Sequence, residues 1–130
     1  MKTVFIIEPD TMLALGYKDS IEALGVQVQI FKTAAQAVRA LEQVVPDVIV
    51  LELALPVHNG FELLYELHSY SDTRNTAVVV NSFVQEADVP FGFISRGHLG
   101  IVDYLYKPLT PPKRLAASVR RALAGVPEAV

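Results

Sequence analysis

The sequence predicts a single α/β domain with an open, parallel five-stranded sheet and helices on both of its faces. One observation is that short apolar runs rich in β-branched residues alternate with segments whose apolar residues recur at helical spacing. Another is size, because a chain of 130 residues, 52% hydrophobic and 19% charged, can bury one core but not two. Strands that alternate with helices pair in parallel through right-handed crossovers, so both faces of the sheet should be covered.

Each predicted strand is a short apolar run that ends at a polar residue or a turn. The first run, 4–7, is closed by Glu-Pro-Asp, and the third, 47–51, is unbroken after its first residue, as in a strand buried on both faces. The second, fourth and fifth strands are expected at 26–31, 77–80 and 101–104. The N-terminal run is too short for the apolar region of a signal peptide, so we interpret it as a strand.

The first predicted helix is capped by Asp10 or Thr11 and stopped by Gly25. Its apolar residues recur at roughly helical spacing, which predicts a face turned toward the sheet. The residues expected on that face are Met12, Leu13, Leu15, Ile21 and Leu24.

Three further helices are predicted at 34–41, 60–70 and 114–124. The first of them begins at Thr33 and ends before Pro46. The last follows Pro111 and Pro112, since proline is tolerated in the first turn of a helix. Its inward-facing residues are expected to be Leu115, Val119 and Leu123.

The connection 83–99 shows no clear helical pattern. It contains Pro90, Gly92 and Gly97, so any helix within it should be short or displaced. Its apolar residues are expected to pack against the sheet or, alternatively, to form an exposed surface for a partner. These residues are Phe91, Phe93 and Ile94.

Composition excludes several classes of function. With 11 basic and 14 acidic residues the net charge is -3, which does not favour direct binding to nucleic acid or to an anionic membrane. Cysteine is absent, which excludes disulfides and thiolate chemistry and suits a reducing cytoplasm, and no apolar stretch approaches the ~20 residues of a membrane-spanning helix. These two observations lead us to expect a cytoplasmic protein. We find neither a phosphate-binding glycine loop nor a nucleophile elbow, so no enzymatic activity is expected.

Four of the five predicted strands are followed by polar residues, with one proline among them. In an open parallel sheet the functional site lies beyond the carboxyl ends of the strands, so these residues should lie close together. They are Glu8, Pro9 and Asp10 after the first strand, Glu52 after the third, Asn81 and Ser82 after the fourth, and Lys107 after the fifth.

The spacing of these residues resembles the receiver domain of two-component response regulators over nearly the whole chain. Pro56 and Gly60 lie four and eight residues after Glu52, and Lys107-Pro108 follows an aromatic residue, Tyr104, at the matching offset. The resemblance implies a flavodoxin-like (βα)5 fold with strand order 2-1-3-4-5, formed by residues 1–125 and followed by a short tail, 126–130. It also makes the peptide bond before Pro108 a candidate for the cis isomer.

The resemblance further implies the roles of the site residues. Glu52 occupies the position of the phosphate-accepting aspartate, and Glu8 and Asp10 form the acidic cluster that, with Glu52, would hold Mg²⁺. No other cofactor is expected. The residues at the positions that respond to phosphorylation are Asn81 or Ser82 for the hydroxyl, Tyr104 for the aromatic and Lys107 for the lysine that pairs with the phosphoryl group.

Two departures from the family pattern bear on this chemistry. Glu52 is one methylene longer than aspartate, and in-line phosphoryl transfer loses about two orders of magnitude in rate for a misplacement of ~1 Å. Pro9 replaces an expected acidic ligand. Glu52 is therefore either a solvated carboxylate or a permanent negative charge that pairs with Lys107 and partly imitates a phosphorylated aspartate.

The sequence thus predicts an atypical receiver domain that is not phosphorylated in the conventional way and that signals by protein contact. Its expected partner is a histidine kinase or a downstream signalling protein, and a homodimer through the face of the fourth helix, fifth strand and fifth helix is a further expectation. The alternatives are an active phosphoacceptor that uses Glu52 or Asp10 with Mg²⁺, and a small enzyme on a flavodoxin-like sheet.

Overall fold

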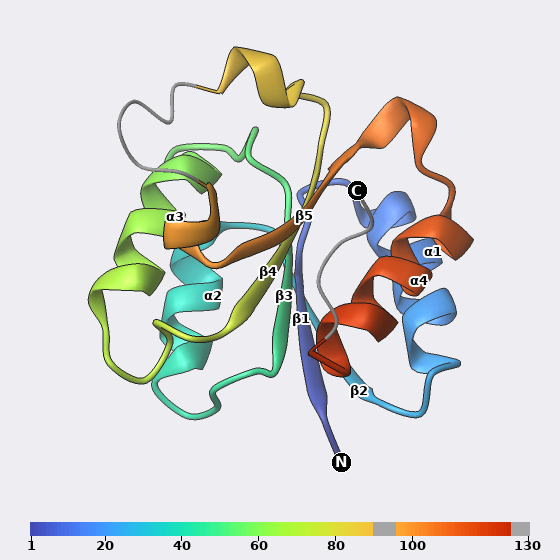
Figure 1. Cartoon of the computed structure of the whole chain (residues 1–130), viewed down its shortest axis with the longest axis horizontal. Coiled ribbons are helices and arrows are strands. Elements are labelled where there is room, and N and C mark those ends of the chain that lie inside the picture. Colours follow the sequence, from blue (N-terminus) through green and yellow to red (C-terminus); the bar gives the residue numbers. More distant parts are fainter. Residues whose placement is uncertain (90–95, 126–130) are drawn as a thin grey trace.

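The computed structural model describes residues 1–89 and 96–125, which form a parallel sheet of order β2-β1-β3-β4-β5 (Figure 1). The sheet and its order confirm the fold predicted from the sequence. The strands are β1 (Thr3–Ile7), β2 (Gln27–Phe31), β3 (Val48–Leu51), β4 (Ala77–Ser82) and β5 (Ile101–Tyr106). The α-helices are α1 (Thr11–Glu22), α2 (Ala34–Leu41), α3 (Gly60–Ser69) and α4 (Pro112–Leu123).

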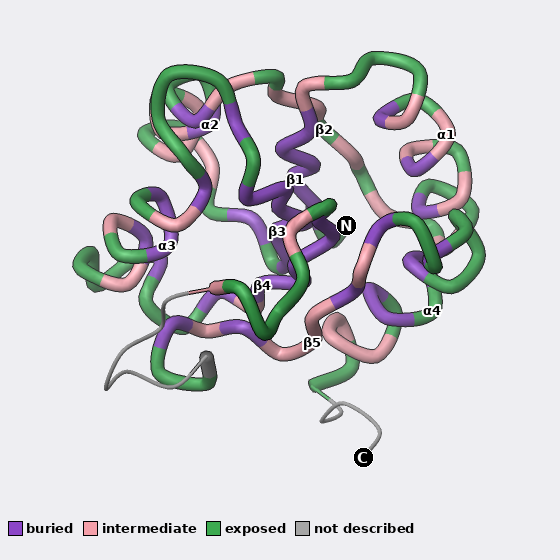
Figure 2. Tube along the Cα trace, turned by 90° about the horizontal axis from the view of Figure 1, so that it is seen from above, coloured by how far each residue is buried: buried purple, intermediate pink, exposed green. Residues whose placement is uncertain are grey.

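Two helix layers enclose the sheet, which divides the apolar interior of the single domain into two cores, one on each face, so the expectation of one undivided core is corrected. Helices α2 and α3 cover one face and α1 and α4 the other, with the buried strands between them (Figure 2). Alternate residues of β1 enter different cores: Phe5 and Ile7 lie on the α2–α3 side, and Val4 and Ile6 on the α1–α4 side. A strand buried on both faces needs apolar residues at every position, which explains its unbroken run.

Side chains cap the first turns of α1 and α3, and Asp10, the cap of α1, is one of the two candidates that the sequence indicates. The Asp10 carboxylate accepts a hydrogen bond from the Leu13 amide at 3.0 Å, and Asn59 caps α3 in the same way. The expected inward face of α1 is partly wrong, because Met12 and Leu15 are exposed. The buried residues of α1 follow an i, i+3, i+7 stripe instead, namely Ala14, Tyr17 and Ile21.

The connection between β4 and β5 contains two short 3₁₀ helices, Glu86–Asp88 and Arg96–Leu99, and no α-helix among its described residues. This agrees with the prediction that any helix there is short. The apolar segment Phe91 to Ile94 lies outside the described residues, as do Pro90 and the tail 126–130. Throughout the described part of the chain, no helix is both long and apolar enough to span a bilayer.

Candidate functional site

Three charged side chains meet at the carboxyl edge of the sheet. Glu8 follows β1, Glu52 follows β3 and Lys107 follows β5, and the carboxyl ends of parallel strands lie at one edge. All three are buried, with exposed fractions of 3%, 2% and 6%. Buried charges are costly unless they are paired, so their contacts decide what the site can do.

Lys107 forms an ion pair with each carboxylate. Its Nζ lies 2.5 Å from Glu8 Oε1 and 2.7 Å from Glu52 Oε1. The same ammonium lies 4.5 Å from the ring centroid of Phe83, within the range of a cation–π contact. One lysine therefore neutralises much of the repulsion between two glutamates that have little access to water.

Both carboxylate oxygens of Glu52 are occupied by donors from the chain itself. Oε1 accepts a hydrogen bond from the Phe83 amide at 3.2 Å in addition to the Lys107 contact. Oε2 accepts one from the Ala54 amide at 3.0 Å and a short one from the Ser82 hydroxyl. The Glu52 side chain is thus held by two backbone amides and two side chains, rather than by solvent.

These contacts also set the protonation states. Burial would raise the pKa of Glu52, but the hydrogen bonds from Lys107, Ser82 and the Ala54 amide outweigh it, so the pKa lies below its ordinary value. Burial would lower the pKa of Lys107, but the hydrogen bonds with Glu52 and Glu8 outweigh it, so the pKa lies above its ordinary value. Glu52 and Lys107 are therefore both charged near neutral pH.

Gly60 allows the loop after β3 to close over this cluster. Its amide donates to the Leu53 carbonyl at 2.8 Å. A Cβ atom at this position would lie 2.7 Å from the Glu52 carbonyl oxygen and 2.8 Å from the Leu53 Cα, closer than a side chain can approach. The glycine eight residues after Glu52 is therefore needed for close backbone packing beside the site.

Ser82, rather than Asn81, provides the hydroxyl at the site. Its Oγ donates to Glu52 and accepts from the Val84 amide at 3.0 Å. The Val84 carbonyl in turn accepts a 2.6 Å hydrogen bond from the hydroxyl of Tyr104, whose pKa is raised to about 12 by burial and by the negative charge of Glu52. The segment after β4 thus links Glu52 to the aromatic residue of β5.

Asn81 points to the other face of β4. Its side-chain amide is buried without a hydrogen bond of standard geometry to a described residue. Burial raises the pKa of the nearby Tyr17 phenol, and the Asn81 amide lies close enough to its hydroxyl to offset part of this rise. Asn81 is therefore not a contact of Glu52, and the alternative that placed the responsive hydroxyl position there is wrong.

The structure does not assemble the three carboxylates predicted to hold Mg²⁺. Asp10 is exposed, its carboxylate caps α1, and only its backbone amide reaches Glu8, donating to Oε2 at 3.0 Å. Lys107 stands between Glu8 and Glu52, where a cation would have to bind. Within residues 1–89 and 96–125 no group of three histidine or acidic side chains is arranged to hold a metal. The residues present do not fit a magnesium ion.

Pro108 lies in a short 3₁₀ helix, Lys107–Leu109, directly after β5. The described residues contain no cis peptide bond, so the Lys107–Pro108 bond is trans and the cis expectation is wrong. The turn is held by the Thr110 hydroxyl, which donates to the Tyr106 carbonyl at 2.8 Å, and a trans proline is compatible with it.

Sequence reasoning missed the contribution of Phe83. It begins the connection after β4, where the pattern was poor in helical signals, and only its position next to Ser82 connects it with the site. In the structure it contributes a backbone donor to Glu52 and a ring beside Lys107. The hydrogen bond from the Ala54 amide to Glu52 could not be predicted either, because every residue except proline carries the same backbone donor.

The doubly wound five-stranded sheet, with a carboxylate, a hydroxyl and a lysine in contact at its carboxyl edge, defines a receiver-class signalling domain. The profile of the response regulator receiver domain matches residues 4–120, and the chain belongs to this family. The family functions in two-component signal transduction.

Curated relatives are identical to this chain at just over a quarter of the aligned positions. The DNA-binding response regulator MtrA of Mycobacterium tuberculosis is 28% identical over 120 residues, which cover 92% of this chain and 50% of that protein. The transcriptional regulatory protein BaeR of Escherichia coli is 28% identical over 120 residues, with 92% and 47% covered. The chain spans about half the length of the curated relatives it matches.

Solved structures agree with the fold. A sensor protein from Polaromonas sp. JS666 superposes with a TM-score of 0.82 at 26% identity, with 95% of this chain and 97% of that chain covered. The chemotaxis response regulator CheY4 of Vibrio cholerae superposes with a TM-score of 0.79 at 19% identity, with 94% and 98% covered. The second likeness supports the fold alone.

Proposed function

We propose that this chain is an atypical receiver domain that is not phosphorylated in the conventional way and that signals by protein contact in a fixed state. The observation that carries the proposal is the environment of Glu52, whose carboxylate is buried and bonded to both Lys107 and Ser82. In the family, a lysine and a hydroxyl at these positions contact the phosphoryl group. Here the glutamate receives those contacts without phosphorylation.

Three features oppose transfer of a phosphoryl group to Glu52. The carboxylate is 2% exposed, so a donor cannot approach either oxygen in line without opening the site. Both oxygens already accept two hydrogen bonds each. The ion that would offset the charge of an incoming phosphate lacks its ligands, because Pro9 replaces one and Asp10 caps a helix.

The same contacts support a fixed signalling state. Ser82 joins Glu52 to the segment that also accepts the Tyr104 hydroxyl through Val84. A permanent glutamate charge holds this chain of contacts as a phosphate would, although one charge and two oxygens imitate only part of a phosphoryl group. A partner would therefore meet one surface conformation rather than two.

The partner in this proposal is a protein. Histidine kinases and downstream signalling proteins are the classes that the family implies, and self-association through the face of β5 and α4 remains a prediction of the sequence. We propose no direct contact with nucleic acid, since the net charge is -3, and no enzymatic activity. A cytoplasmic location likewise stays a prediction.

Intact-mass spectrometry after incubation with acetyl phosphate and Mg²⁺ tests the proposal. We expect no phosphorylated species of the natural chain under conditions in which a conventional receiver is modified completely. The matched variants are Glu52→Asp, which shortens the side chain, and Glu52→Asp with Pro9→Asp, which also restores the missing ligand; phosphorylation should rise in that order. A phosphoryl group on the natural chain would contradict the proposal, and peptide mapping would then distinguish Glu52 from Asp10 as the acceptor.

A further inference from the structure

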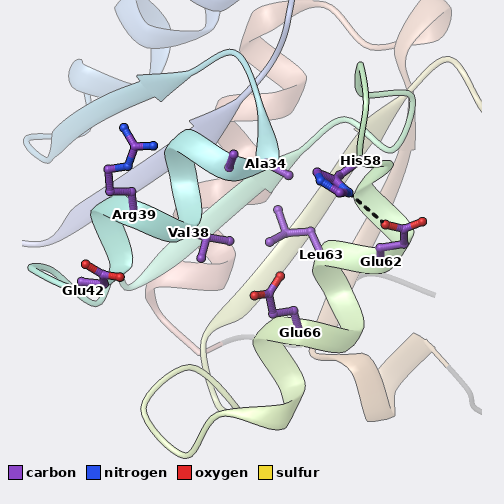
Figure 3. Close-up of a pocket in the computed structure, with 9 residues that line it drawn as sticks. Ala34, Val38, Arg39, Glu42, His58, Glu62, Leu63 and Glu66 are labelled. Atoms are coloured by element: carbon purple, nitrogen blue, oxygen red, sulfur yellow. Dashed lines mark ion pairs between the residues drawn. The ribbon is translucent and has the colours of Figure 1, made fainter.

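A groove between α2 and α3 lies away from the Glu52 site. Its cavity has a volume of ≈ 470 Å³, and Figure 3 shows Val38 and Leu63 facing each other across its floor. The hollow continues past Val38 and Glu42 into a second cavity of ≈ 290 Å³ that reaches Asp72. We call this surface the acidic groove and define it by the carboxylates that rim it, Glu42, Glu62, Glu66 and Asp72.

Negative charge dominates the rim. The two cavities are lined by four carboxylates but by only one guanidinium, that of Arg39, and one imidazole, that of His58. His58 Nδ1 lies 3.5 Å from Glu62 Oε2, but both side chains are more than 60% exposed, so the pair is weak. In Figure 3, Arg39 points away from Glu62. An apolar floor with an acidic rim favours a ligand that is apolar in the middle and basic at its edges.

The chain carries a complementary surface on the opposite side of the sheet. Helix α4 contains four basic residues and no acidic one. Lys113, Ala117 and Arg120 are exposed and follow an i, i+4, i+7 spacing, so they share one face of the helix. Ala117 in the middle of this face lets another surface approach closely, with a cation one turn away on either side. We call this face the basic stripe.

We propose that the acidic groove binds the basic stripe of a second copy of this chain. The two surfaces match in charge and in the position of their apolar parts, although the chain as a whole is acidic. The two surfaces lie in different helix layers, α2–α3 and α1–α4 (Figure 1). When the groove of one copy binds the stripe of another, the stripe of the first copy and the groove of the second therefore stay free. A head-to-tail contact between unlike surfaces builds assemblies larger than a dimer, either open chains of molecules or rings where the rotation from copy to copy closes.

Light scattering as a function of concentration gives the first test. The weight-average mass of the natural chain at low ionic strength should rise past that of a dimer as concentration approaches the millimolar range. It should fall back to the monomer in about 1 M salt, where the Debye length is ~3 Å. A mass that stays monomeric at low salt, or that stops at the dimer, would overturn the proposal.

Complementation between variants gives the sharper test. Glu62→Lys with Glu66→Lys removes the acidic groove, and Lys113→Gln with Arg120→Gln removes the charges of the basic stripe; each double variant alone should be monomeric. An equimolar mixture retains one good surface of each kind and should form a dimer whose mass does not grow further. Failure of the mixture to associate would refute the pairing of these two surfaces.

A matched control separates position from net charge. Asp19→Lys with Glu22→Lys changes the charge of exposed α1 residues by the same amount as the groove variant. This control should associate at least as strongly as the natural chain. If it were monomeric as well, net charge and not the groove would be responsible, and the proposal would fail.

The outcome is independent of phosphorylation at Glu52, because neither surface includes Glu8, Glu52 or Lys107. The groove variant should remain as resistant to acetyl phosphate as the natural chain. If the chain were monomeric throughout and an added basic amphipathic peptide still bound the groove, the occupant would be a foreign protein and the second-copy proposal would be wrong.

Discussion

The buried cluster at the carboxyl edge and the acidic groove use the same side chains in opposite environments. In the cluster, Glu8 and Glu52 share one ammonium out of contact with water. In the groove, Glu62 is mostly exposed and its neighbour His58 is too. A buried charge must be satisfied inside the molecule and becomes part of the fold, whereas an exposed charge remains available to other molecules.

This difference predicts where substitutions act. Removing a member of the buried cluster should change stability strongly, because the remaining charges stay desolvated. Removing a groove carboxylate should leave stability nearly unchanged and act on association only. Substitutions in the two regions should therefore differ in kind, from large losses of stability in the cluster to weaker association in the groove.

Lys107→Ala should cause the largest loss of stability. It leaves Glu8 and Glu52 close together without a cation, and breaking a buried ion pair costs about 3–5 kcal/mol. For a domain of this size that corresponds to a fall in melting temperature of about 10 °C or more, measurable by thermal unfolding followed by circular dichroism. Lys113→Ala, an exposed lysine, is the control and should change stability by less than about 0.5 kcal/mol.

The cause of that loss can be checked with a compensated variant. Lys107→Met combined with Glu8→Gln and Glu52→Gln removes all three charges together, and should recover much of the stability lost by Lys107→Ala. An unchanged melting temperature for Lys107→Ala would show that the cluster is not a structural requirement, and the contrast with the groove would then not hold.

Gly60→Ala should cause the next largest loss of stability. The added Cβ would meet the backbone of Glu52 and Leu53, which cannot shift as a side chain can, and such overpacking costs about 1–3 kcal/mol. Gly16→Ala within α1 is the matched control, because nothing lies within 4 Å of its Cβ position. Alanine there should stabilise by roughly 0.5–1 kcal/mol. Equal effects of the two substitutions in chemical denaturation would rule out the close approach.

The fold was largely predictable because its signals are local. An unbroken apolar run is enough to predict a strand such as β3. Because the carboxyl ends of parallel strands lie at one edge of the sheet, the same prediction places Glu8, Glu52 and Lys107 together. The inward face of α1 was less predictable. Met12 and Leu15 are apolar yet exposed, because burial depends on how the helix is rotated against the sheet.

The details of the site were less predictable because they depend on rotamers and backbone donors. The sequence could not distinguish Asn81 from Ser82, since adjacent strand residues point to opposite faces and a shift of one residue exchanges them. It also could not decide between helix cap and metal ligand, the two roles expected of Asp10, because a carboxylate after a strand serves equally well as either.

The dependence of stability on pH should distinguish the cluster from the groove again. The folded-state pKa of Glu52 lies below its unfolded value of about 4.3, so its contribution is present above that pH and is lost as pH falls through the folded pKa. The natural chain should be more stable than Glu52→Gln at neutral pH, and this gap should narrow in urea unfolding below pH ~4.3. A gap that stays constant as the solution is acidified would show that Glu52 is not stabilised in its charged form.

The smallest expected effect is that of Glu62→Gln in the groove. Its pair with His58 spans 3.5 Å between two exposed side chains, and exposed pairs contribute about 0–1 kcal/mol. We therefore expect a melting temperature within a few degrees of that of the natural chain, together with weaker association in light scattering at low salt. A loss of stability comparable to that of Lys107→Ala would mean that this exposed carboxylate is also part of the fold, and the division between the two regions would be wrong.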